Sequence, residues 1–167
     1  MTRNSAIGTP TFDRRLLLVG LVAGMVYGMM EMVIEAVIGH GFWSPLRYIA
    51  SVFTLGKDTD PTFSFVPVFV GLMGHMMNSV VFGLIFAYFV TRIARGSVAV
   101  AAVGMAYAAA IFVMMWFVVL PIIDPAMLLV NATGFFVSHL PYGLLLGGGL
   151  AYLRRREPVR TSGAGTA

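Results

Sequence analysis

The chain lacks cysteine and carries little charge. Among 167 residues there is no Cys, and only 11% are Asp, Glu, Lys or Arg, whereas about a quarter are charged in a soluble domain. The missing cysteine excludes disulfides, thiolate metal sites and a catalytic thiol. Hydrophobic residues make up 59% of the chain and the mean hydropathy is +0.89, so the composition is that of a membrane protein.

Basic residues are absent from long stretches of the chain. Between Arg15 and Arg92 the only ones are Arg47 and Lys57, and residues 96–153 contain none. The others form short clusters that flank apolar runs, as in membrane topology signals. Despite the sequence pI near 9.9, this placement argues against a nucleic-acid partner.

Four apolar runs are long enough to cross a bilayer, which takes about 20 helical residues. They cover residues 15–39, 65–91, 97–120 and 131–153. Helix is expected because backbone groups in lipid must be satisfied internally, and no run alternates with period two as a barrel strand would. The sequence therefore predicts an all-α membrane protein with one four-helix transmembrane domain over residues 14–156. The segments 1–13 and 157–167, rich in Ser, Thr, Gly and Ala, are predicted to be disordered cytoplasmic tails.

The positive charges also predict the orientation. They precede the first run, separate the second from the third, and follow the fourth, so both termini are expected in the cytoplasm. In the long first outer connection, Ser44-Pro45 resembles a helix N-cap and first turn, and Gly56 ends the apolar spacing. Residues 45–55 are therefore predicted to form a short amphipathic helix, on the outer membrane surface or over the mouth of the bundle.

One pattern occurs twice. His75, Gly83, Tyr88 and Arg92 are answered, at identical intervals, by His139, Gly147, Tyr152 and Arg156. The chain is therefore interpreted as a duplicated helical hairpin, a parallel repeat of about residues 15–92 and 96–156. Such a repeat places His75 and His139 at one depth, in the outer half of the bilayer.

The polar residues at this depth form the candidate site. Glu31 and Glu35 follow one face of the first run and approach the level of the two histidines. Ionisable groups inside a membrane are costly and indicate function by default. The supporting polar residues are Tyr27, Asn78, Ser79 and Tyr142, and the glycines expected at helix contacts are Gly24, Gly28, Gly71, Gly143 and Gly147.

Three interpretations of this cluster stay open. His75, His139, Glu31 and Glu35 are residue types that hold a transition metal, and paired imidazoles can ligate haem, so haem, copper or iron are candidate cofactors. The same residues would suit proton or cation handling in a transport-related protein. In the third interpretation they only fix helix register in a non-catalytic accessory subunit of a larger complex, or in a homo-oligomer, without a cofactor. The sequence offers no catalytic residues, and His40 is interpreted as a solvated boundary residue.

The segments Gly74-His75 and His139-Leu140-Pro141-Tyr142-Gly143 carry a resemblance. Over about residues 15–155 the chain resembles small bacterial inner-membrane proteins of unknown function, the YagU-like proteins among them. The resemblance implies four helices in the inner membrane and supplies no catalytic residues. The segments Glu31–Glu35 and Trp43–Tyr48 have no counterpart in that pattern.

Overall fold

The computed structural model describes residues 14–156 except 57–58 and 95. The two predicted tails lie outside the described residues. Every regular element in the described part is helical, as predicted. The long helices are α1 (Arg14–Val37), α3 (Phe65–Ile93), α4 (Ser97–Met114) and α6 (Ala132–Arg156); the short elements are α2 (Ser44–Ser51), η1 (Val52–Thr54), η2 (Met115–Val119), α5 (Leu120–Ile123) and η3 (Pro125–Leu129).

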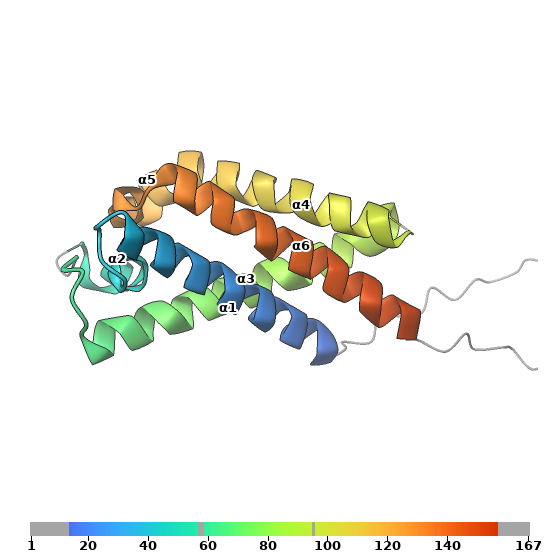
Figure 1. The fold of residues 1–167 in the computed structure, drawn as a ribbon, viewed down its shortest axis with the longest axis horizontal. Coiled ribbons are helices and arrows are strands. Elements are labelled where there is room, and N and C mark those ends of the chain that lie inside the picture. Colours follow the sequence, from blue (N-terminus) through green and yellow to red (C-terminus); the bar gives the residue numbers. More distant parts are fainter. Residues whose placement is uncertain (1–13, 57–58, 95, 157–167) are drawn as a thin grey trace, which may run out of the picture.

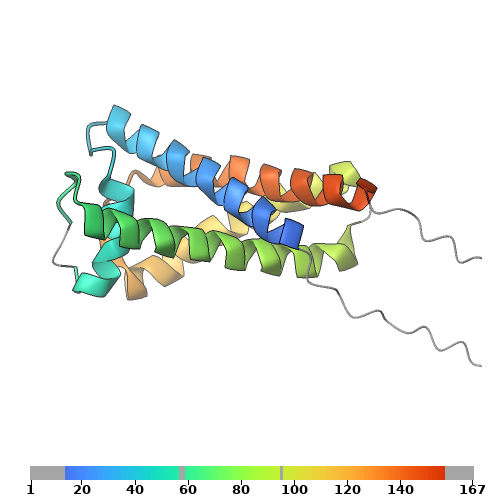
Figure 2. The same ribbon diagram turned by 90° about the horizontal axis from the view of Figure 1, so that it is seen from below.

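The long helices run roughly side by side in an elongated bundle (Figures 1 and 2). Four helical segments are long and apolar enough to cross a membrane, namely 14–37, 65–90, 97–123 and 132–156, which agrees with the predicted spans. The start of α1 and the end of α6 lie at one end of the bundle, and α2 and α5 lie at the other (Figure 1). We call the end with α2 the outer end, following the predicted orientation.

Glycines hold α4 and α6 in close contact. A Cβ atom added at Gly143 would overlap the carbonyl oxygen of Gly104, and one added at Gly147 would lie 2.7 Å from the Cα of Ala101. Only residues without a side chain allow backbones to approach this closely. At the C-terminal end of α6, the Arg154 side chain donates to the Ala94 carbonyl over 2.8 Å and connects α6 to the end of α3.

α1 packs against both α3 and α6. Toward α3, a Cβ at Gly24 would overlap the Ser79 side chain, and one at Gly28 would lie 3.0 Å from Nε2 of His75. Together with Gly143 and Gly147, four of the five predicted packing glycines therefore lie at contacts between long helices. The fifth, Gly71, instead faces the Leu46 carbonyl of α2.

α3 and α4 pack together only in the inner part of the bundle. There the Tyr107 hydroxyl donates to the Phe82 carbonyl over 2.9 Å, and the Tyr107 ring lies 5.3 Å from the Phe86 ring. A strict twofold repeat would give α3 and α4 the same close packing as α1 and α6. In the structure, α1 and α6 contact each other much more extensively than α3 and α4 do. The duplicated hairpin remains a prediction.

The first outer connection contains α2, followed by the short turn η1. The helix begins at Ser44, so Ser44 is not the cap that the sequence suggested; its hydroxyl donates to the Gly41 carbonyl over 2.8 Å instead. Nearly all of α2 is buried against α3, and Leu55 and Gly56 end the segment with positive φ angles. α2 lies across the outer end of the bundle (Figure 2).

The second outer connection is more helical than predicted. The third apolar run was predicted to end at residue 120, but the π-helical turn Met115–Val119 leads directly into α5, which contains Pro121. The Leu120 amide still donates to the Met115 carbonyl within this continuous helix, whereas Pro121 has no amide to donate. The third span consequently reaches Ile123.

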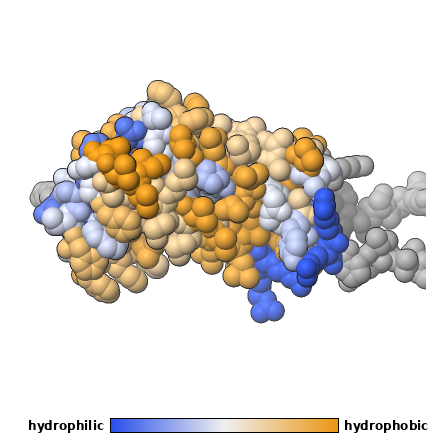
Figure 3. Space-filling view, viewed as in Figure 1, coloured by the Kyte–Doolittle hydropathy of each residue, from blue (hydrophilic) through white to orange (hydrophobic). Residues whose placement is uncertain are grey.

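Hydrophobic side chains cover most of the visible face of the bundle (Figure 3). Hydrophilic residues gather at the end where α6 finishes with Arg154, Arg155 and Arg156. Apolar flanks between polar ends are typical of a helical protein embedded in lipid.

Candidate functional site

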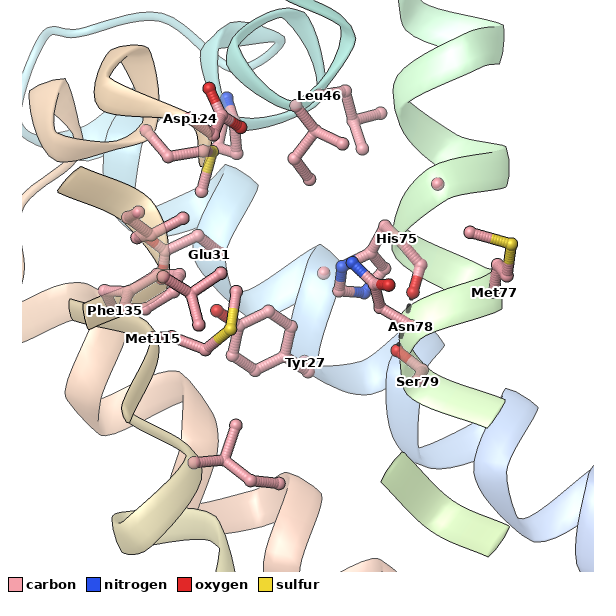
Figure 4. A pocket seen from close by; sticks show the side chains of 18 of the residues that line it. Tyr27, Glu31, Leu46, His75, Met77, Asn78, Ser79, Met115, Asp124 and Phe135 are labelled. Atoms are coloured by element: carbon pink, nitrogen blue, oxygen red, sulfur yellow. Dashed lines mark hydrogen bonds between the residues drawn. The ribbon is translucent and has the colours of Figure 1, made fainter. Parts of the chain in front are cut away.

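A cavity of about 350 Å³ occupies the outer half of the bundle. Its walls come from α1, α3 and α6 and from the segment between Ile111 and Met127, and α2 with η1 lies over its outer end. In Figure 4, Tyr27 and His75 lie side by side, whereas Asp124 and Leu46 lie at the end beside α2. Most of the lining is apolar, and the polar groups converge from α1, α3 and α6.

Tyr27 joins the two candidate histidines. Its ring stacks on His75 with centroids 5.1 Å apart and meets the edge of His139 at 4.7 Å. Both histidines are at least nine-tenths buried and line the cavity. The structure thus brings together the imidazoles that the sequence placed at one level, with an aromatic ring in contact with each.

Each histidine binds a backbone carbonyl. Nε2 of His75 lies 2.8 Å from the Gly24 oxygen, and Nδ1 of His139 lies 2.7 Å from the Phe135 oxygen. A carbonyl oxygen can only accept, so these ring nitrogens are the donors. In the neutral rings the other nitrogens, Nδ1 of His75 and Nε2 of His139, are left as acceptors.

Only one of the two carboxylate oxygens of Glu31 has a hydrogen-bond partner among the described residues. The carboxylate is 1% exposed and lines the cavity. Its Oε2 atom accepts the Ser138 hydroxyl over 2.8 Å, whereas Oε1 is buried and has no hydrogen-bond partner among the described residues. A buried polar atom without a partner carries a desolvation cost, so Oε1 of Glu31 can gain from a hydrogen-bond donor in the cavity.

Glu35 is satisfied by the protein itself. Its Oε1 atom accepts the Asn131 amide over 2.7 Å, and its Oε2 atom accepts Nδ1 of His40 over 2.8 Å. The Asn131 side chain in turn accepts the Gly134 amide and caps the start of α6. Glu35 therefore fixes helix ends and does not line the cavity. The interpretation of His40 as merely solvated was wrong: its side chain is 46% exposed but pairs with Glu35.

The predicted supporting residues fall into two groups. Tyr142 and Ser79 are buried: the Tyr142 hydroxyl donates to the Ser79 carbonyl over 2.7 Å, and the Ser79 hydroxyl donates to the His75 carbonyl over 2.9 Å. Asn78 is exposed and lies on α3 at the edge of the cavity, next to His75 (Figure 4). The contacts of Tyr142 and Ser79 link α6 to α3 beside the histidines, whereas Asn78 lies at the exposed rim of the cavity.

Asp124 adds a carboxylate that the sequence did not place in the site. It lines the outer end of the cavity, where Oδ1 accepts the Ser51 hydroxyl over 3.3 Å and connects α2 to the turn before η3. Burial raises the pKa of Asp124 to about 6, although the hydrogen bond from Ser51 opposes the shift.

The geometry does not support a metal or haem centre. Within residues 14–156, apart from the three that are not described, no group of three or more His, Cys, Asp or Glu side chains could hold a metal ion. Glu35 is taken up by Asn131 and His40, and each imidazole packs against Tyr27. Paired axial imidazoles would have to face each other across a porphyrin, and the Tyr27 ring occupies that position.

Two residues of this site, Ser138 and Asp124, were not predicted from the sequence. Ser138 lies four residues before Tyr142, so the helical spacing of α6 already placed it on the same face. For Asp124 no such signal existed, because only the packing of η3 under α2 brings it to the cavity. In comparisons with known proteins, no family model, curated protein or solved structure matches this chain.

Proposed function

We propose that this multipass membrane protein is a non-catalytic binding protein for a small amphipathic molecule that enters from the bilayer. The observation that carries the proposal is the cavity of about 350 Å³ with Glu31 in its wall. Small-molecule sites of about 300–1,000 Å³ are typically apolar with a few convergent polar groups. This cavity has that composition.

The entrance supports access from lipid. The rim includes Asn78 on α3, Phe53, which is 69% exposed, and Ile123, which is 61% exposed. Asn78 is the fourteenth residue of α3, so at 1.5 Å per residue it lies roughly 20 Å along the helix, near the middle of a ~30 Å hydrocarbon core. The opening extends from the outer end, where Phe53 and Ile123 lie, to the depth of Asn78, so its inner part would face acyl chains.

The proposal keeps the non-catalytic character expected from the sequence and replaces the metal or haem by an organic ligand. We place the protein in the bacterial inner membrane with both termini in the cytoplasm, supported by the arginines at the end where α1 begins and α6 finishes. A place in a larger complex, and kinship with the YagU-like proteins, belong to the same proposal.

Native mass spectrometry of the chain in lipid nanodiscs tests the binding function. The probes are dodecylamine, 1-dodecanol and dodecanoate, which share one chain and differ in head group. At least one should bind saturably, with one molecule per chain. Asn78→Trp, which places a large side chain at the rim, should weaken that binding roughly tenfold or more.

Met73→Trp is the matched control, because Met73 is exposed on α3 but does not line the cavity. It should bind the probe as the wild type does. If none of the three amphiphiles binds saturably, or if Asn78→Trp and Met73→Trp behave alike, the proposed function is wrong.

A further inference from the structure

We infer that the ligand carries a protonated amine on a hydrophobic chain, and that Glu31 is its counter-ion. The inference rests on the proposed function and specifies its chemistry. It follows from which hydrogen-bonding groups of the cavity are already used and which are left.

Three buried hydroxyl donors of the site form hydrogen bonds within the protein. Ser138 donates to Glu31, Tyr142 donates to the Ser79 carbonyl, and Ser79 donates to the His75 carbonyl. These bonds measure 2.7–2.9 Å, so the donors are well engaged. A ligand that needs hydrogen-bond donors finds few here.

The unused polar atoms are acceptors. They are Oε1 of Glu31 and, because each imidazole donates to a carbonyl, the second ring nitrogens of His75 and His139. Acceptors call for a donor-rich ligand, and an ammonium group has three N–H donors and no acceptor. The Tyr27 hydroxyl in the wall and the Asn78 amide at the exposed rim can donate, but each of them can also accept a hydrogen bond from a ligand.

The charge balance points the same way. Among the described residues that line the cavity there are two carboxylates, Glu31 and Asp124, and no Lys or Arg. A buried carboxylate without a counter-charge is strongly unfavourable, and a cation at hydrogen-bond distance offsets that cost. Because the cavity supplies no such cation, a cationic ligand would complete it.

Aromatic rings would add to the binding of a cation. Tyr27 and Phe135 both line the cavity and pack edge to face, with centroids 6.0 Å apart. A cation above such a ring is attracted by the negative face of the ring, most strongly when the cation is desolvated. Most other residues of the wall, Leu46 and Met115 among them, are apolar and suit an alkyl chain.

The head group is tested with the same three probes at neutral pH. Dodecylamine should bind wild-type protein roughly tenfold more tightly than 1-dodecanol, and dodecanoate should bind more weakly than both. This ranking uses unmodified protein, so it does not depend on any variant folding. Equal binding of dodecylamine and 1-dodecanol would overturn the inference while leaving the proposed function intact, whereas the absence of any binding would remove both.

Variants then identify the counter-ion. Glu31→Gln keeps an acceptor for Ser138 and removes the charge, so it should weaken dodecylamine binding roughly tenfold and leave 1-dodecanol binding unchanged. Asp124→Asn removes the second carboxylate of the cavity and should weaken dodecylamine binding less than Glu31→Gln does, because Oδ1 of Asp124 already accepts the Ser51 hydroxyl. Loss of the preference for the amine in Asp124→Asn but not in Glu31→Gln would show that the wrong carboxylate had been assigned.

Discussion

The two sides of this bundle are built differently. Where α4 meets α6, glycines bring the backbones so close that a single methyl group at Gly143 would overlap the facing carbonyl. Where α3 faces α4, the helices touch around Tyr107 and Phe82 and then enclose the cavity toward the outer end. One side is therefore a closed seam and the other an open side.

The difference shows how a bundle of apolar helices can enclose a cavity. Helices in lipid associate through close packing, because lipid chains are as apolar as the side chains themselves. Small residues concentrated along the α4–α6 seam provide that packing. The open side instead carries bulky residues, and one of them, Phe82, reaches the cavity wall.

The largest effect on stability is expected where α4 meets α6. Gly143→Ala should destabilise the protein by about 3 kcal/mol, because the new methyl group would displace the Gly104 backbone. Gly148→Ala is the control: its added methyl group would meet nothing within 4 Å, so stability should hold or rise by about 1 kcal/mol as helix propensity improves. Reversible unfolding of detergent-solubilised protein measures both. Equal losses in the two variants would show that the seam is not closely packed.

Neutralising the two carboxylates of α1 should change the stability of the protein by different amounts. Glu35→Gln should cost about 2 kcal/mol, because a charged acceptor shared by Asn131 and His40 is lost. Glu31→Gln should cost less than about 1 kcal/mol, since the bond to Ser138 survives and an unpartnered buried charge disappears. The same unfolding experiment compares them. A larger loss in Glu31→Gln would mean that its charge stabilises the empty bundle and is not reserved for a ligand.

The smallest effect is expected from pH at the outer end of the open side. The pKa of Asp124 is raised to about 6, above its usual value of 3.8, so the folded protein binds a proton more tightly there than the unfolded chain does. Stability from this group is therefore full at low pH and falls as the pH rises from about 4 to about 6. Relative to Asp124→Asn, the wild type should lose thermal stability between pH 4 and pH 7. An unchanged difference in Tm across that range would contradict the raised pKa.

The spans could be predicted from the sequence because they depend on local composition. Each is a run of apolar residues whose length matches a bilayer, and the structure has helices at all four places. The positions of Gly24, Gly28, Gly143 and Gly147 at contacts between long helices also followed from helical spacing. The ends of the outer segments were less predictable, since Ser44 and Pro121 are compatible with both a loop and a first helical turn.

The roles of the polar residues could not be predicted in the same way. In the sequence Glu31 and Glu35 are equivalent: both are acidic, one helical turn apart, on one face of α1. Only packing separates them, since the start of α6 reaches Glu35 and leaves one oxygen of Glu31 at the cavity. The apparent four-ligand site was for this reason a poor guide to metal binding.

The sequence by itself determined that this chain is a helical membrane protein with four spans and buried polar groups at one depth, because hydrophobicity and helical periodicity are properties of each segment alone. Tertiary structure decided which helices pack closely and which enclose a cavity, and hence which carboxylate keeps an unused oxygen. Those outcomes depend on contacts between residues as far apart as Glu31 and Ser138, and no local pattern encodes such a distance.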